Sequence, residues 1–423
     1  MAAMAQLPTL VLSVLLVLLG LGSSAMAREV RVTPAGNLQQ VLAMAKPGDV
    51  IRVAPGTYRG NLAITVPRIQ VIGEGLPILD GEGKGTVITI VAEGVTLRGF
   101  RITQGGSSPY GSDAGVKVSD AGGCVLEDNV IDRVFNGIYL KGSEESRIRR
   151  NQVTGAAPSA SFDAWGDGIR LWSSPGSRLE GNRVSQFRDG FYLDFSPKAT
   201  LADNQSFENR RYGLHFMFMN ESRFTGNRFE RNQAGTVLMY SKQLLIEDNV
   251  FADNRGHVGS GILFKENNDS RLEGNRILNN TVGMFIDGSN RNRFEGNIVA
   301  ANGWGVHLFS SSIDNVFTRN AFSVNDFDVA VDMRISRNLF DGNHWSAYEG
   351  YDLDGNGQGD VPHSPVSMFS YLTMRYPDLS AFVGSPAVKA LAFAQRLFPV
   401  LSPSALQDAH PVMSHARLAD DSR

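Results

Sequence analysis

Arg211-Tyr-Gly-Leu-His-Phe-Met-Phe-Met-Asn220 alternates, residue by residue, between bulky apolar side chains and a second set of side chains. A period of two is typical of a β-strand with one buried face. The residues expected to point into the core are Leu214, Phe216 and Phe218. Those expected to point outward are His215, Met217 and Met219. The outward set carries imidazole and thioether groups, which can bind soft metal ions.

Asparagine recurs around this stretch at intervals close to 22 residues. The column consists of Asn129, Asn151, Asn182, Asn204, Asn227, Asn249, Asn275, Asn297, Asn320 and Asn343. Three positions before each of the first nine lies an apolar residue: Leu126, Ile148, Leu179, Leu201, Phe224, Ile246, Leu272, Phe294 or Phe317. A fixed period of this length indicates stacked repeats that form one solenoid with a continuous interior stripe.

A second asparagine column follows five residues later, at Asn209, Asn232, Asn254, Asn280, Asn302 and Asn325. Asparagine tolerates left-handed turns, and its amide can bond to the neighbouring coil. Each coil also contains a glycine followed by an in-out-in strand, at Gly137, Gly168, Gly190, Gly213, Gly261, Gly283 and Gly305. Three short strands per coil predict an all-β fold, a parallel β-helix, and the usual crossover preference predicts a right-handed one.

Comparing the coils isolates two columns of outward residues. The first is Tyr139, Arg170, Tyr192, His215, Val237, Leu263, Phe285 and His307. The second is Lys141, Trp172, Asp194, Met217, Met239, Lys265, Asp287 and Phe309. His215, Met217, Met219 and Met239 fall on adjacent coils, and imidazole with thioether suits Cu(I) better than zinc, calcium or magnesium. The alternative is an apolar patch for a partner protein, because methionine is common on such surfaces.

Two coils are longer than the others. The spacing rises to 31 between Asn151 and Asn182 and to 26 between Asn249 and Asn275. Both insertions precede the glycine-led strand, so we expect both to project from the same edge and to wall a groove. The second carries His257, which is either a further copper ligand or a solvated loop histidine.

Composition and targeting signals set the cellular context. The net charge of -3 gives no electrostatic reason to expect nucleic acid, and the single Cys124, expected to be buried, argues against disulfides or a thiolate zinc site. An apolar run ending in Ala25-Met26-Ala27 predicts a secretory signal over residues 1–27, although no basic residue precedes the run.

The remaining segments follow from local patterns. Residues 28–345 are predicted to form the β-helix with an N-terminal cap, which includes a short helix over Leu38–Lys46. Residues 346–365 form an Asp/Gly-rich loop with calcium-loop-like oxygen spacing at Asp352, Asp354, Asn356 and Asp360. The usual bidentate Glu is missing, so a structural calcium and a polar turn both remain open. Residues 366–400 read as one or two helices and 401–423 as a disordered tail.

The asparagine-ladder solenoid, Arg211-Tyr-Gly-Leu-His-Phe-Met-Phe, Gly350-Tyr-Asp-Leu-Asp-Gly-Asn-Gly-Gln-Gly-Asp-Val-Pro and Gly384-Ser-Pro-Ala-Val together resemble the NosD family of periplasmic accessory proteins for nitrous oxide reductase. The resemblance implies a periplasmic β-helix that helps to assemble the copper sites of the reductase. It also implies work with an ABC transporter, made of a permease and an ATPase, and with a copper-delivering lipoprotein. The His/Met cluster then becomes a candidate copper relay, and the C-terminal helices a candidate dock on the permease. The family contributes no catalytic residue.

A carbohydrate-active β-helix, a polysaccharide lyase or uronate epimerase, is the rival class. Such an enzyme needs an acid–base constellation, for which Asp194, Tyr192, Arg170 and His215 are the candidates. The Asp-Pro-His-Asp run associated with alginate epimerases is absent, and His215 is flanked by methionine instead of carboxylate and arginine. A scaffold that binds no ion is the third reading.

Overall fold

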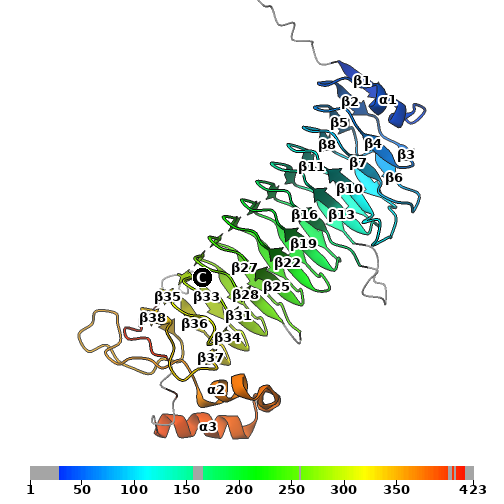
Figure 1. Ribbon diagram of the computed structural model, residues 1–423. Coiled ribbons are helices and arrows are strands. Elements are labelled where there is room, and N and C mark those ends of the chain that lie inside the picture. Colours follow the sequence, from blue (N-terminus) through cyan, green and yellow to red (C-terminus); the bar gives the residue numbers. More distant parts are fainter. Residues whose placement is uncertain (1–27, 156–164, 257–258, 399–402, 404–405, 415–423) are drawn as a thin grey trace, which may run out of the picture.

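The computed structural model describes residues 28–155, 165–256, 259–398, 403 and 406–414, so the predicted signal over 1–27 lies outside the described residues. The chain forms a parallel β-helix of three long sheets, as predicted. Figure 1 shows helix α1 at one end of the solenoid and helices α2 and α3 at the other. Cys124 is buried in the core, as expected, and its burial raises the pKa of the thiol.

Sheet A contains 14 strands. They are β1 (Glu29–Val32), β2 (Val50–Val53), β5 (Gln70–Gly73), β8 (Thr96–Arg98), β11 (Val125–Glu127), β14 (Arg147–Arg149), β17 (Arg178–Glu180), β20 (Thr200–Ala202), β23 (Arg223–Thr225), β26 (Leu245–Glu247), β29 (Arg271–Glu273), β32 (Arg293–Glu295), β35 (Val316–Thr318) and β38 (Leu339–Asp341).

Sheet B contains 13 strands. They are β3 (Thr57–Arg59), β6 (Ile78–Asp80), β9 (Arg101–Thr103), β12 (Val130–Asp132), β15 (Gln152–Thr154), β18 (Arg183–Ser185), β21 (Gln205–Phe207), β24 (Arg228–Glu230), β27 (Val250–Ala252), β30 (Arg276–Leu278), β33 (Ile298–Ala300), β36 (Ala321–Ser323) and β39 (His344–Trp345).

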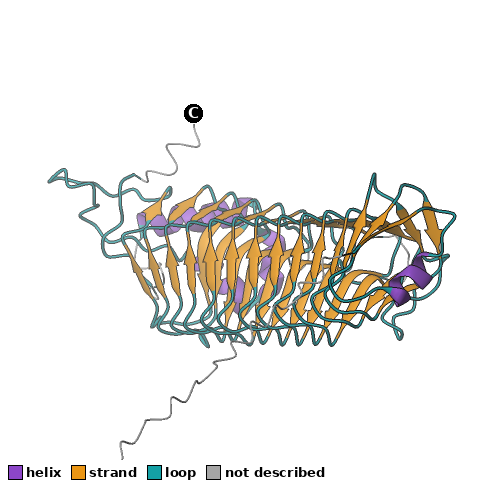
Figure 2. Cartoon of the chain, turned by 90° about the horizontal axis from the view of Figure 1, so that it is seen from above, coloured by secondary structure: helices purple, strands orange, loops and turns teal. Residues whose placement is uncertain are grey.

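Sheet C contains 12 strands and carries the predicted outward columns. They are β4 (Leu62–Ile64), β7 (Ile88–Ile90), β10 (Ala114–Ser119), β13 (Asn136–Lys141), β16 (Ile169–Trp172), β19 (Asp189–Asp194), β22 (Tyr212–Met217), β25 (Ala234–Met239), β28 (Ser260–Lys265), β31 (Val282–Asp287), β34 (Trp304–Leu308) and β37 (Phe327–Val331). Successive coils add one strand to each sheet, and Figure 2 shows the sheets running along the whole solenoid.

The helices lie at the two ends. The N-terminal helix α1 (Leu38–Met44) is capped by the Asn37 side chain, which accepts from the N–H of Gln40. At the other end, α2 (Met368–Arg375), the 3₁₀ helix η2 (Pro377–Phe382) and α3 (Pro386–Leu397) follow one another. Ser367 and Ser385 cap α2 and α3, and proline starts α3, where its missing N–H costs nothing.

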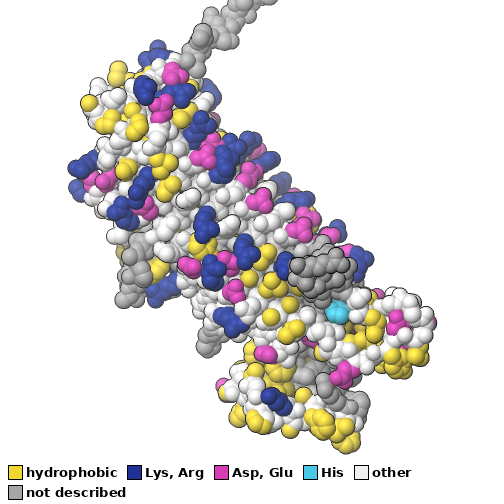
Figure 3. Space-filling view, turned by 180° about the vertical axis from the view of Figure 1, so that it is seen from behind, with side chains coloured by type: hydrophobic (Ala, Val, Ile, Leu, Met, Phe, Trp, Pro, Cys, Tyr) yellow, Lys and Arg dark blue, Asp and Glu magenta, His cyan; other side chains and the backbone are white. Residues whose placement is uncertain are grey.

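The interior is a long apolar stripe built from the residues that precede each asparagine. These side chains are buried, and toward the C-terminal end they become stacked phenylalanines. The ring centroids of Phe294 and Phe317 are 4.3 Å apart, and those of Phe317 and Phe340 are 4.2 Å apart. Outside, ion pairs such as Arg223–Glu247 and Arg291–Asp269 join coils, and Figure 3 shows both signs of charge interspersed along one side.

Both predicted asparagine columns are buried hydrogen-bond ladders. Asn227 is representative: its Oδ1 accepts from the backbone N–H and the Nδ2 of Asn204, at 3.0 and 2.9 Å. Its own Nδ2 donates to the Leu201 carbonyl and to Asn249 Oδ1, both at 2.9 Å. Each side chain therefore satisfies backbone groups that the turns would otherwise bury unpaired.

A third ladder, built mostly from serine, was not predicted. It runs through Ser143, Ser174, Ser196, Met219, Ser241, Asn267, Ser289 and Ser312, and each N–H before that of Ser312 donates to the side chain of the next coil. Met219 occupies a serine position, so its Sδ accepts the Ser196 N–H at 3.0 Å and the side chain is buried.

The predicted alternation therefore fails at the end of the quoted stretch. β22 ends at Met217, and Phe218 takes a left-handed backbone with φ 52°, which reverses the in-out order. Phe218, predicted to point inward, is 41% exposed, and the predicted outward position of Met219 is wrong. Phe218 stacks between Phe195 and Tyr240 of the adjacent coils, with centroids 4.8 and 5.2 Å away.

The C-terminal segment closes the last coil. Asp408 is buried, and its carboxylate accepts from the N–H and Nδ2 of Asn343 and from Trp345 Nε1. Val412 forms a bridge with His344. Disorder predicted for residues 401–423 is thus wrong for 406–413, because this segment supplies the acceptor that the next coil would have provided.

Candidate functional site

The outer face of sheet C carries the two columns in the predicted register. In the first column, His215 on β22 lies between Tyr192 on β19 and Val237 on β25. In the second column, Met217 lies between Asp194 and Met239. Strands in one sheet lie about 4.8 Å apart, so imidazole and two thioethers share one small area.

His215 is held from behind by a buried carboxylate. Its Nδ1 lies 3.3 Å from Asp189 Oδ2 and 3.2 Å from Arg211 Nη2, and the side chain is only 12% exposed. When Nδ1 carries the proton it donates to Asp189, which leaves Nε2 with its lone pair. Metal-binding histidines commonly use their second nitrogen in this way, because the carboxylate fixes the tautomer and the ring orientation. Edge contacts with Tyr192 and Tyr212 further restrict the ring.

Asp189 is itself neutralised by arginine. Burial opposes ionisation of Asp189, but hydrogen bonds from Arg211 and His215 outweigh it and lower the pKa of the carboxyl. Neighbouring Asp167 accepts from Arg188 Nη2 at 2.9 and 3.0 Å. Burial and the charge of Asp189 raise the pKa of Asp167 to about 6. The two carboxylates and their arginines form a rigid charged layer at the start of β19 and β22.

Three of the five predicted copper residues are brought together. His215, Met217 and Met239 share the outer face, and all three are half-buried, so each can reach solvent. Met219 lies in the core and cannot join them without leaving its ladder. His257 lies outside the described residues, so its predicted contribution is not placed.

Several residues of this face were missed at the level of sequence. Asp189 and Arg211 sit at or before the strand starts, and only the register shows that they reach His215. Asp194 was noticed as a column member, but its Oδ1 is buried beside Met217 and has no hydrogen-bond partner among the described residues. The exposed aromatic row next to the methionines depends on a left-handed backbone at each aromatic residue, and an aromatic residue does not by itself indicate that conformation.

The two insertions lie in corresponding connections of the repeat, and the groove that they are expected to wall stays a prediction. The first connects β15 to β16 and the second connects β27 to β28, so both lead from sheet B to sheet C. β19, β22 and β25 lie between them in the strand order. In the described part of the first insertion, Trp165 faces Arg210, whose Cζ is 5.2 Å from the ring centre.

The four acid–base candidates also lie together. The Arg170 guanidinium is 4.9 Å from the centre of the Tyr192 ring, and Tyr192 is 4.8 Å from His215 between ring centres. Burial raises the pKa of Tyr192 and the pKa of Asp194. A tyrosine that takes a proton from a sugar carbon needs a lowered pKa, so this environment does not favour that role.

The Asp/Gly-rich loop uses its oxygens internally. Asp352 accepts from the N–H groups of Gly355 and Gly357 at 2.7 and 2.8 Å. Asp354 and Asn356 each accept from a backbone N–H two residues later, and Asp360 accepts from Leu353. The Gly357 N–H, foremost, lowers the pKa of Asp352. The turn is therefore held by its own hydrogen bonds, and the calcium site stays a prediction.

Two absences concern the described residues only. No three histidine, cysteine or carboxylate side chains gather there as a metal site. No described helix has the length and apolar character needed to span a membrane.

The family model and the two relatives described below carry the same family name. Residues 157–350 match the family model described as "Periplasmic copper-binding protein (NosD)". The "Probable ABC transporter binding protein NosD" of Pseudomonas aeruginosa is 34% identical over 411 residues, covering 85% of this chain and 87% of the relative. The protein of the same description from Stutzerimonas stutzeri is 30% identical over 410 residues, covering 86% of each.

Solved structures share the fold at low identity. The mannuronan C-5 epimerase AlgE4 A-module of Azotobacter vinelandii aligns with a TM-score of 0.51 and 14% identity, over 70% of this chain and 86% of that chain. The catalytic domain of a GH87 alpha-1,3-glucanase aligns with a TM-score of 0.57 and 12% identity, over 75% and 69%. At such identities the likeness concerns the solenoid alone.

Proposed function

The chain belongs to the NosD family of periplasmic copper-binding proteins, and we propose that it relays Cu(I) during maturation of the copper sites of nitrous oxide reductase. Its close relatives are described as probable ABC transporter binding proteins, so its partner is an ABC transporter. In this proposal copper is cargo. The ion is received and handed on, and no bond is made or broken in a substrate.

One observation carries the proposal: a buried carboxylate orients His215 beside two thioethers in register. Nδ1 of His215 faces Asp189, and when Nδ1 carries the proton Nε2 is free for the ion, while Met217 and Met239 lie directly opposite each other on neighbouring strands. Thioether and imidazole are soft or intermediate ligands that favour Cu(I). With three ligands on a half-exposed face, the ion remains accessible to an incoming donor or acceptor.

The partners follow the family. The proposed donor is a copper-delivering lipoprotein, and the proposed acceptor is nitrous oxide reductase. We propose that the permease of the transporter is contacted by the C-terminal helices. α3 and the residue after it expose Phe393, Leu397 and Phe398, each at about 60%, and Figure 3 shows hydrophobic side chains gathered at that end. An exposed apolar helix face of this kind is typical of a protein interface.

The test is an anaerobic Cu(I) titration of the mature protein against a competing chelator. Wild type should bind one equivalent, and the variant His215→Ala/Met217→Ala/Met239→Ala should bind none while unfolding as cooperatively as wild type. Met219→Ser is the matched control, because it removes a thioether from the core and leaves the face unchanged. If the triple variant binds copper as tightly as wild type, this face is not the copper site and serves only as a partner surface.

A further inference from the structure

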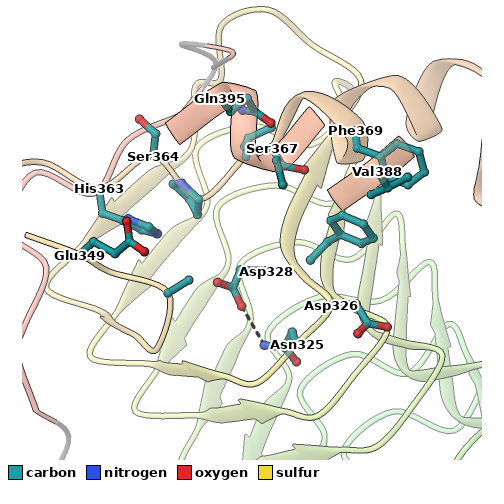
Figure 4. Close-up of a pocket in the computed structure, with 15 residues that line it drawn as sticks. Asn325, Asp326, Asp328, Glu349, His363, Ser364, Ser367, Phe369, Val388 and Gln395 are labelled. Carbon is teal, nitrogen blue, oxygen red and sulfur yellow. Dashed lines mark hydrogen bonds between the residues drawn. The ribbon is translucent and has the colours of Figure 1, made fainter. Parts of the chain in front are cut away.

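A cavity of about 360 Å³ lies between the last strand of sheet C and the C-terminal helices. Figure 4 shows its floor at the turn before β37 and its roof at α3. The floor is formed by Asn325, Asp326, Phe327 and Asp328. Its walls include Phe369 of α2 and His363. The volume suits a small molecule.

Asp328 points into this cavity because of its place in the repeat. From β10 to β34 the coils have glycine at this position, since a Cβ there would collide with the next coil; at Gly305 it would lie 2.5 Å from the Asp328 carbonyl oxygen. β37 is the last strand of sheet C, so the position can carry a side chain. The carboxylate therefore extends along the solenoid axis into the space where the next coil would lie.

The carboxylate of Asp328 is poorly compensated. One oxygen accepts from Asn325 Nδ2 at 3.0 Å, and the other has no hydrogen-bond partner among the described residues. Burial raises the pKa of Asp328 to about 6. The second asparagine column ends here at Asn325. The first ends at Asn343, where Asp408 accepts several hydrogen bonds. A partly buried anion whose one hydrogen-bond partner is a neutral amide favours a cationic ligand.

The rest of the cavity agrees with a cation. Its described lining contains no lysine or arginine, and Asp326 adds a second carboxylate at the floor. His363 is neutral, because burial lowers its pKa to about 4. The rings of Phe327 and Phe369 lie 5.3 Å apart and offer apolar, electron-rich surface, which attracts ammonium groups.

A hydrogen-bond donor lies beside the carboxylate. In earlier coils the N–H of each asparagine in this column donates to the side chain of the next asparagine. The Asn302 N–H, for example, donates to Asn325 Oδ1 at 3.0 Å. The N–H of Asn325 itself has no acceptor among the described residues. A ligand that carries an oxygen near its ammonium group would satisfy both groups at once.

We propose that this cavity binds a small organic ammonium ion, with Asp328 as its counter-ion, and that an amino alcohol fits best. The ammonium group donates to Asp328, the hydroxyl accepts from the Asn325 N–H, and the carbon chain lies against Phe327 and Phe369. A bound ligand would also tie α3 to the solenoid, because Val388 and Ala392 of α3 line the cavity. This site is independent of copper.

Binding is measured by titration calorimetry on the mature protein with ethanolamine, ethylammonium and uncharged ethylene glycol at millimolar concentrations. Ethanolamine should bind more tightly than ethylammonium, and ethylene glycol should not bind. Asp328→Asn should weaken ethanolamine about tenfold or more, because a charge-assisted hydrogen bond is lost. The matched control Asp314→Asn, at an aspartate that pairs with Arg337 and does not line the cavity, should change affinity less than about twofold.

A second variant guards against a folding defect in Asp328→Asn. Ala392→Phe fills the cavity from α3 without touching the ladder, so it should abolish ethanolamine binding while the thermal midpoint stays near that of wild type. Hydrogen exchange in α3 should slow when ethanolamine is added to wild type. The proposal is overturned if wild type binds neither amine, if ethylene glycol binds equally well, or if the cavity-filling variant retains binding.

Discussion

The carboxylate of Asp408 accepts hydrogen bonds from the N–H and the Nδ2 of Asn343, at 3.0 and 2.9 Å, although the two residues are 65 positions apart in the sequence. An aspartate thereby occupies the place that asparagine holds in each coil from Asn129 to Asn343. Unlike asparagine it donates nothing further, so it ends the ladder while accepting also from Gly342 and Trp345.

Asp408→Ala should therefore open the last coil. It leaves several buried donors without an acceptor, at roughly 1–3 kcal/mol each. Hydrogen exchange should quicken at Gly342, Asn343 and Trp345 while protection near Asn227 is unchanged, because repeats fray from their ends. Asp408→Asn, which keeps one carbonyl oxygen, is the control and should lose less protection. Equal protection in Asp408→Ala and wild type would show that the cap is not needed.

Asp189→Asn should weaken Cu(I) binding about 10- to 100-fold, the usual effect of removing the partner of a metal-binding histidine. The mutation removes the charge that fixes the His215 tautomer and leaves Arg211 without its carboxylate. Competition titration measures the affinity, and circular dichroism checks the fold. Asp287→Asn, in the same outer column as Met217 but three strands further along sheet C than β22, should leave the affinity unchanged. An unchanged affinity in Asp189→Asn would remove the carboxylate from the copper proposal.

Met219→Ser should bind copper like wild type, because the thioether it removes is in the core. Its effect on stability combines two terms. The serine hydroxyl can accept the Ser196 N–H as in other coils, but the lost volume costs about 2–5 kcal/mol. Urea unfolding gives the change in free energy of unfolding. Loss of copper binding in a well-folded Met219→Ser protein would instead mean that the turn at Phe218 rearranges to bring Met219 outward.

Asp328→Asn should stabilise the protein at pH 7 but not at pH 4. The pKa of Asp328 is about 6 in the folded protein against 3.8 ordinarily, so the folded state binds the proton more tightly. Ionisation of Asp328 therefore lowers the free energy of unfolding of wild type. This loss is absent below pH 3.8, grows as the pH rises and is complete above pH 6, where it is at most about 3 kcal/mol. Asp326, Glu349 and His363 also line the cavity and are unchanged between the two proteins. Free energies of unfolding of both proteins across pH 4 to 7 measure the difference, and a pH-independent difference would contradict the raised pKa.

Removing calcium with a chelator should leave the thermal midpoint unchanged. Asp352, Asp354 and Asn356 already accept backbone N–H groups, so the loop has its own hydrogen bonds without an ion. Scanning calorimetry with calcium and with chelator tests this. A clear fall in midpoint with chelator, absent in Asp352→Ala, would establish the calcium site that the spacing first suggested.

The coils were predictable because the same local structural requirements select asparagine and glycine in each repeat. A buried turn needs a hydrogen-bond acceptor for its backbone N–H groups, which Asn227 supplies. Gly305 lies too close to the next coil for a side chain. Both requirements recur in each coil, so both residue types can be recognised in the sequence. The outward columns followed from strand alternation and agree with the register.

The errors arose where alternation stops. The left-handed backbone at Phe218 reverses which residues point inward, so Phe218 and Met219 lie on the opposite sides from those predicted. A phenylalanine does not by itself indicate a left-handed backbone. Asp408 and Asp189 were missed because their roles depend on contacts distant in sequence. Such partners are visible only after the coils are stacked.

The uniform coil gives the molecule the properties of a ruler. His215 lies on β22, five strands before the last strand of sheet C, which fixes its height at about 24 Å above the helical end. Gain or loss of one coil would move that height by about 4.8 Å and leave every other contact intact. The working reach of the protein can thus change only in whole steps, and a one-coil deletion would test whether a partner tolerates the wrong length.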